Sequence, residues 1–124
     1  MPAKIDREWN IILPRGDTLG FSLRNDGDRQ LSEADGAELA VRAIEGGEVV
    51  LRKIARAEGN VFRFRIAPED TRDMQEGAYL YDIRIITDAD FTDETDLKPG
   101  ADSDVYSVFA PSLRKFFIGR TADV

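Results

Sequence analysis

The stretch Phe62-Arg63-Phe64-Arg65-Ile66 carries the pattern that decides the fold. Large apolar side chains alternate with arginines, so an extended chain places the apolar side chains on one face and the arginines on the other. Aromatic and β-branched residues also favour extended backbone, because they pack well on a pleated surface. The stretch therefore predicts a half-buried β-strand with a basic outer face.

The same alternation extends over most of the 124 residues, and turn residues interrupt it about every 8–12 positions. Pro68–Met74 differs, because a proline followed by acidic residues predicts one or two helical turns, which Gly77 would stop. Together these patterns predict an all-β chain: an immunoglobulin-like antiparallel β-sandwich of about seven strands with one short helical crossover, in a single domain over residues 1–124. Strands are expected near residues 5–14, 19–23, 39–43, 49–54, 62–66, 79–87, 105–109 and 116–118.

Two short motifs refine this prediction. Gly46-Gly47 stands between two alternating segments and suits a type I′ hairpin, because both positions of that turn need positive φ. Strand spacing alone fits a barrel as well as a sandwich, and Tyr79 favours the sandwich. It follows Gly77 at the entrance to a long strand, where a tyrosine of immunoglobulin-like domains packs inward and bonds back to the preceding crossover. The alternative interpretation is an ordinary strand tyrosine.

The formal charge of −7 is concentrated in residues 88–104, a predicted loop insertion that we call the acidic segment. It holds seven acidic residues and one lysine, so the rest of the chain is nearly neutral. Carboxylate oxygens suit Ca²⁺, although the spacing does not match an EF-hand. The other interpretations are a solvated loop held open by charge repulsion and an acidic docking strip for a basic partner. The candidate calcium ligands are Asp88, Asp90, Asp102 and Asp104.

Basic residues at outward strand positions form a second candidate site. Arg63, Arg65 and Arg84 are expected to line up across adjacent strands, and Arg42 and Arg52 would extend the row. Such a row would suit a partner with an acidic surface. The alternative is pairing within the sheet, for which the acidic candidates are Glu38, Glu48 and Asp82.

Composition excludes several function classes. Without cysteine or histidine the chain has no disulfide, thiol nucleophile, Cys/His zinc site or histidine base. It also lacks a glycine-rich nucleotide motif and a nucleophile elbow, and we expect neither catalysis nor a cofactor. An acidic chain without a basic block repels a phosphate backbone, so nucleic-acid binding is not expected. With no long apolar run and no apolar leader in residues 1–8, neither membrane insertion nor a signal peptide is expected.

Several motifs together resemble a known family. Arg15-Gly16-Asp17-Thr18-Leu19-Gly20-Phe21 resembles the opening of the N-terminal domain of phage upper baseplate proteins and related prophage tail proteins. An Asp26-Gly27 turn and a segment running from Gly36-Ala37 to Arg42 match the middle of that pattern. The box that runs from Glu69-Asp70-Thr71 to Tyr79-Leu80-Tyr81-Asp82-Ile83 resembles its most specific part.

This resemblance implies an immunoglobulin-like domain that anchors a protein to a phage tail baseplate and supplies no catalytic residues. We therefore predict a non-enzymatic structural or adaptor protein, located in the virion tail or in the bacterial cytoplasm before assembly. Its partners would be other tail and baseplate proteins, with several copies held in one assembly. The alternative is a small sandwich module that binds carbohydrate or a cell-surface ligand through exposed aromatic residues, with Ca²⁺ in the acidic segment as a further option.

Overall fold

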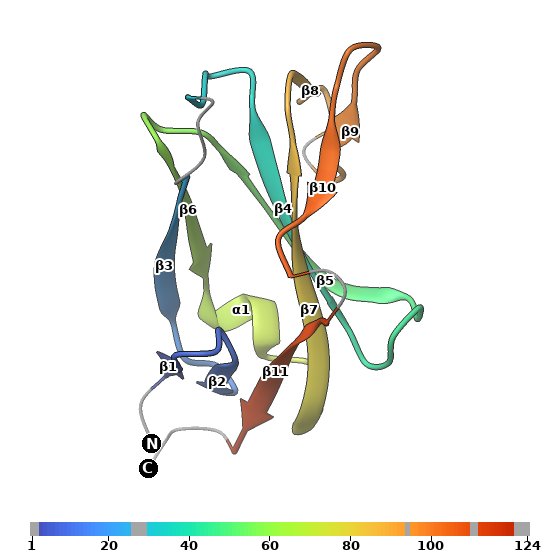
Figure 1. The fold of residues 1–124 in the computed structure, drawn as a ribbon. Coiled ribbons are helices and arrows are strands. Elements are labelled where there is room, and N and C mark those ends of the chain that lie inside the picture. The colour runs from blue at the N-terminus through green and yellow to red at the C-terminus, as the bar shows by residue number, and fades with distance from the viewer. Residues whose placement is uncertain (1–2, 26–29, 94, 110–111, 121–124) are drawn as a thin grey trace.

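The computed structural model describes residues 3–25, 30–93, 95–109 and 112–120, so the predicted Asp26-Gly27 turn lies outside the described residues. Two β-sheets of unequal size lie on either side of one hydrophobic core, as Figure 1 shows. In chain order the elements are β1 (Lys4–Ile5), β2 (Ile11–Pro14), β3 (Leu19–Arg24), β4 (Gly36–Arg42), β5 (Val49–Arg56), β6 (Val61–Ile66), α1 (Pro68–Thr71), β7 (Gly77–Ile86), β8 (Ala89–Asp90), β9 (Lys98–Pro99), β10 (Val105–Ser107) and β11 (Arg114–Gly119).

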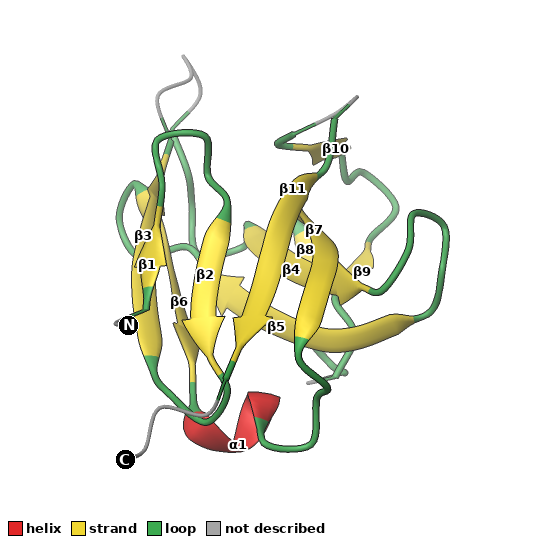
Figure 2. Ribbon diagram, turned by 90° about the horizontal axis from the view of Figure 1, so that it is seen from below, coloured by secondary structure: helices red, strands yellow, loops and turns green. Residues whose placement is uncertain are grey.

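The larger sheet has the strand order β1-β2-β11-β7-β4-β5, and β10 pairs with the part of β7 that lies beyond β11. β3 and β6 form the opposite layer, and α1 closes one end of the sandwich, as the view in Figure 2 shows. β8 and β9 pair with each other as a separate antiparallel hairpin. The all-β prediction is confirmed. The expected purely antiparallel pairing is wrong, because β11 runs parallel to β2. The described residues form eleven strands rather than about seven, and three of them contain only two residues.

The core follows the alternation that the sequence displays. In β6, Phe62, Phe64 and Ile66 are buried, whereas Arg63 and Arg65 are exposed. Since strand side chains point alternately to the two faces of a sheet, each layer contributes one apolar face to the interior. The largest fully buried side chains come from both layers: Tyr81, Phe62, Phe116, Ile11, Leu13, Leu39, Ile66 and Ile83.

The predicted strand over residues 5–14 is interrupted by a turn. Asp6 Oδ1 accepts the backbone N–H of Asn10 at 2.9 Å, and Trp9 has a positive φ of 67°. The chain therefore reverses, and β1 pairs with β2 as a hairpin. The Tyr81 hydroxyl donates to the Trp9 carbonyl and ties this turn to the core, where burial raises the pKa of Tyr81 well above its ordinary value.

The connection between β4 and β5 differs from the predicted two-residue hairpin. It covers residues 43–48, and the Gly47 N–H donates to the Ile44 carbonyl at 3.0 Å. Gly46 has a φ of +77°, whereas Gly47 has no positive φ, so the type I′ prediction is wrong. The bend is one position earlier than the glycine pair suggested, and Gly46 alone provides the left-handed conformation.

The crossover between the layers contains the predicted helical turn. α1 begins at Pro68, and the Ala67 N–H donates to the Asp70 carboxylate at 2.7 Å. The helix ends at Thr71, so Gly77 opens β7 rather than stopping the helix. The Tyr79 hydroxyl donates to the Gln75 carbonyl in this crossover at 2.8 Å, which confirms the predicted bond back from the strand.

Candidate interaction surface

The outer face of the larger sheet, which points away from β3 and β6, carries Arg42, Arg52 and Arg84 of the predicted basic row. Side chains opposite one another on paired strands point to the same side. Register therefore places Glu38 beside Arg84, and Lys115 beside Leu80, on this face. The half nearest β8 and β9 is charged, and the half nearest the start of β7 is largely apolar.

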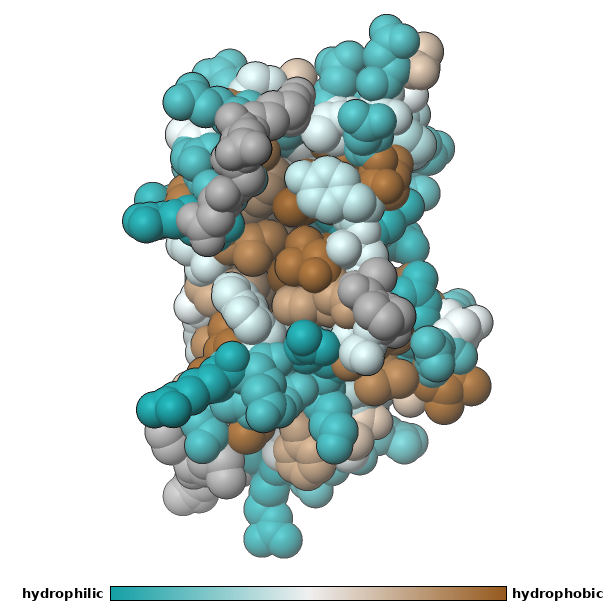
Figure 3. Space-filling model, in the orientation of Figure 1, coloured by the Kyte–Doolittle hydropathy of each residue, from teal (hydrophilic) through white to brown (hydrophobic). Residues whose placement is uncertain are grey.

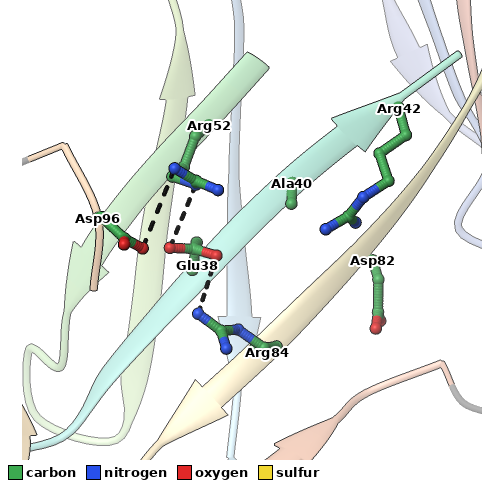
Figure 4. A pocket seen from close by; sticks show the side chains of 7 residues that line it. All are labelled: Glu38, Ala40, Arg42, Arg52, Asp82, Arg84 and Asp96. Carbon is green, nitrogen blue, oxygen red and sulfur yellow. Dashed lines mark hydrogen bonds and ion pairs between the residues drawn. The ribbon is translucent and has the colours of Figure 1, made fainter. Parts of the chain in front are cut away.

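A hollow of about 400 Å³ opens in the charged half, as Figure 4 shows. Glu38, only 3% exposed, lies at its centre. Its Oε1 accepts Arg84 Nη2 at 3.1 Å, and its Oε2 lies 3.5 Å from Arg52 Nε. One buried carboxylate thus holds two arginines from strands on either side of it. The hollow is lined by Glu38, Ala40, Arg42, Arg52, Asp82, Arg84 and Asp96.

The remaining charges of the hollow hold its walls in place. Asp82 accepts the Ser107 hydroxyl and, at 3.4 Å, the Phe109 N–H, so it fixes the chain after β10 against β7. Arg42 Nε donates to the Gly47 carbonyl at 2.9 Å and braces the β4–β5 connection. With three arginines facing three acids, the lining is electrically balanced. The hollow is therefore a paired network and not a site of excess positive charge.

The predicted row of Arg63, Arg65 and Arg84 does not exist. Arg63 and Arg65 lie on β6 and point outward from the smaller sheet, whereas Arg84 lies on the outer face of the larger sheet. The helical crossover carries the chain from one layer to the other between these positions, so the outward faces of β6 and β7 are opposite sides of the molecule. The alternative of pairing within the sheet is confirmed for Arg52 and Arg84, which share Glu38.

The acidic segment is packed rather than fully solvated. Leu97 is 1% exposed, and its N–H donates to Glu38 Oε2 at 3.2 Å while its carbonyl accepts Arg84 Nη2 at 3.2 Å. A Cβ on Gly36 would lie 2.8 Å from side-chain atoms of both Leu97 and Phe91, so only glycine lets the segment lie this close. The Arg56 guanidinium lies 4.0 Å from the centre of the Phe91 ring. The β8–β9 hairpin thus packs over one end of the outer face and covers it.

Two aspartates of this segment form local turns instead of a shared ion site. The Thr92 hydroxyl donates to Asp90 Oδ1 at 2.7 Å and lowers the pKa of that carboxyl, and the Thr95 hydroxyl acts in the same way on the pKa of Asp93. Asp88, Asp102 and Asp104 are exposed. Within the ranges that the structure describes, no three acidic side chains converge as metal ligands would, so the calcium interpretation gains no support.

An apolar strip crosses the other half of the outer face. Phe117 on β11, 46% exposed, stands between Ile12 of β2 and Ala78 of β7. Leu80 continues the strip along β7, two residues from Ala78. A groove of about 370 Å³ runs beside Phe117, and Lys115, Asn10 and Asp6 form part of its lining. We call Ile12, Ala78, Leu80 and Phe117 the apolar strip.

Other exposed apolar side chains lie elsewhere. Ile44 and Val50 are 68% and 48% exposed at and near the β4–β5 connection, which forms the brown projection at the lower right of Figure 3. Tyr106 is 47% exposed, but it stands opposite Ile85, which faces the core, so it points to the inner side of the larger sheet. Figure 3 also shows apolar surface in the opening between β3 and β10.

Comparison with known proteins returned no relative. No family model matches the chain, no curated protein matches it, and no solved structure matches its fold. In the described part of the chain, no helix is long and apolar enough to cross a membrane.

Proposed function

We propose that this chain is a non-enzymatic structural or adaptor protein of a phage or prophage tail baseplate, which acts through protein–protein contacts. The observation that carries the proposal is the apolar strip with Phe117 at its centre, set on a rigid sheet beside fixed charges. Exposed aromatic side chains next to a polar rim are typical of protein interfaces. The motifs around Arg15 and Tyr79 favour the baseplate among possible assemblies.

The immunoglobulin-like classification is part of this proposal. Its support comes from the strand arrangement, since β4, β7 and β11 share one layer and β3 and β6 form the other. The Tyr79 hydroxyl bond to Gln75 has the geometry of a tyrosine corner, which such sandwiches use to fix the crossover. A fixed crossover keeps the outer face rigid, and a rigid face loses little entropy when it docks.

A structural role also agrees with the bonding of two carboxylates that line the hollow. Both oxygens of Glu38 are engaged by arginines and a backbone N–H, and Asp82 bonds to Ser107. A general acid or base needs an oxygen that can reach a substrate proton. These carboxylates instead hold strands and loops together, as an assembly component requires.

The test uses tail particles purified from cells that carry the gene. We expect the protein in the particles, and we expect cross-links from Lys115, beside the apolar strip, to a neighbouring baseplate or tail-tube protein. Lys98, on the acidic segment at the other end of the outer face, is the matched control site and should cross-link less to that partner. Absence of the protein from intact particles, or a gene placed within a metabolic operon, would refute the proposal.

The carbohydrate-binding alternative needs two or three aromatic rings on one exposed surface. Among the residues that the structure describes, the two large exposed aromatic side chains are Tyr106 and Phe117. Register places them on opposite sides of the larger sheet, so they form no common platform. No observation favours this alternative over the adaptor proposal.

A further inference from the structure

The apolar strip and the acidic segment lie at opposite ends of the same face. Leu97 packs at the end of the outer face formed by Gly36 and Glu38, whereas Phe117 stands beside Ala78 near the start of β7. In Figure 1 the β8–β9 hairpin is at the top and the start of β7 is at the bottom. The face therefore has one acidic end and one apolar end.

Three basic residues flank the apolar strip. Lys4 stands opposite Ile12, and both Lys115 and Arg42 stand opposite Leu80, so all three share the outer face with the strip. The acidic segment carries seven acids and one lysine. The end with the apolar strip thus carries three bases against Asp6 in the groove, whereas the other end is strongly acidic, so the two ends are complementary in charge.

We propose that the outer face binds a second copy of this chain across a two-fold axis, in an antiparallel arrangement. A two-fold axis that lies in the plane of the contact and runs across the middle of the face turns the second copy over and reverses it end for end. Each acidic segment then lies over the apolar strip and the flanking bases of the other copy. Closed two-fold dimers use one self-complementary surface in this way.

A dimer of this kind needs only a modest share of the surface of the chain. A standard interface takes about 800 Å² from each partner, and the accessible surface of the chain is 7588 Å². A contact over the outer face thus needs only about a tenth of the surface. The acidic segment rises above the sheet at one end, so a reversed copy fits its raised end against the flat strip. A parallel arrangement would instead place acid against acid.

The dimer covers the apolar strip that the proposed function assigns to a tail neighbour, so one copy cannot make both contacts at once. The test of the dimer needs only the purified chain. Sedimentation velocity measures the dimer Kd over protein concentrations up to about 500 µM. We expect a dimer, with a Kd that rises about tenfold or more in Phe117→Ser. Tyr106→Ser is the matched control, because Tyr106 is equally exposed but points to the other side of the sheet. Its Kd should stay within about twofold of the parent value.

A charge exchange tests the antiparallel geometry. Lys115→Glu places acid against acid in both halves of the dimer. The double variant Asp93→Lys/Asp96→Lys changes two aspartates that line hollows of the outer face, and it weakens the same contacts from the other side. Each variant alone should be mostly monomeric, and an equal mixture of the two should form a heterodimer with a Kd near the parent value. Circular dichroism and thermal unfolding check that each variant is folded.

Several outcomes would overturn the proposal. One is a parent chain that stays monomeric at the highest concentration, because the outer face would then bind a different protein and not a second copy. Equal losses in Phe117→Ser and Tyr106→Ser would place the contact elsewhere, and so would a mixture that fails to restore dimerisation. The two proposals are tested by separate experiments. A purified chain that stays monomeric does not refute the baseplate proposal, and a chain that is absent from tail particles does not refute the dimer.

Discussion

Replacing Leu97 with alanine tests whether the acidic segment belongs to the folded unit. Leu97 is 1% exposed and packs over Gly36, and its backbone bonds to Glu38 and Arg84. A buried leucine truncated to alanine costs about 2–5 kcal/mol. The lower half of that range applies, because a hairpin at the edge of the fold can partly collapse into the space. We expect a loss of about 2.5 kcal/mol in the free energy of unfolding.

The corresponding fall in Tm follows from the size of the chain. At about 2.1 cal/mol/K of unfolding entropy per residue, a 124-residue domain loses roughly 10 °C for this change. Urea unfolding followed by the fluorescence of Trp9, the single tryptophan, measures the global transition. Hydrogen exchange at the Leu97 N–H measures the hairpin itself, and that amide should be protected in the parent protein.

Val50→Ala is the matched control for this experiment. Val50 is 48% exposed on β5, and a surface change of this kind shifts stability by about 0.5 kcal/mol or less. If Leu97→Ala changed stability no more than Val50→Ala did, and the Leu97 N–H exchanged as fast as an amide in an open loop, the acidic segment would not be packed against the sheet. The acidic segment would then be the solvated loop that its sequence suggests.

Three further predictions concern the network and the crossover. Glu38→Gln keeps the shape of the side chain but removes the charge that two arginines share, and it should lower the free energy of unfolding in urea by about 1–3 kcal/mol. The control is the exposed Glu48→Gln, which should lower it by about 0.5 kcal/mol or less. Equally small losses in both variants would show that the two ion pairs do not stabilise the fold. Tyr79→Phe removes the bond to Gln75 and should cost about 0.5–1.5 kcal/mol, and no loss would contradict a structural role for that bond. Because the pKa of Asp90 is lowered in the folded state, its ionised form stabilises the fold above the ordinary value of 3.8, and this contribution is lost as the pH falls through the lowered pKa. The urea midpoint of Asp90→Asn should therefore approach that of the parent below pH 3.8, and a difference that is constant with pH would contradict the assignment.

Local signals in the sequence were sufficient for most strands. β6 and β3 follow a simple alternation, and burial of one face is all that their formation requires. The Tyr79 bond was also predictable, because its partner Gln75 lies only four residues away. The turn before β2 was not, since a run that alternates correctly can still reverse when Asp6 binds two backbone N–H groups.

The residues that share the outer face could not be predicted from local sequence patterns. Arg63 and Arg84 both occupy outward positions, and alternation cannot tell that their strands belong to different sheets. Phe116 and Phe117 are adjacent aromatic residues, so hydrophobicity alone does not decide that Phe116 is buried and Phe117 exposed. A signal for Leu97 was present, because a leucine and a phenylalanine within an acidic run are unusual in a purely solvated loop.

The arginines of the larger sheet and the acidic segment are one structural unit rather than two separate features. Arg52 and Arg84 donate to carbonyls of the segment, and Arg56 lies over its Phe91 ring. Three positive charges beneath the hairpin reduce the repulsion among its carboxylates, and they do so where the sheet excludes part of the solvent. This explains how a segment with a net charge of −6 can pack against a sheet. Lys98 and Arg52 lie 4.0 Å from Asp93 and Asp96, and in the proposed dimer the bases beside the apolar strip of a second copy add to these partners.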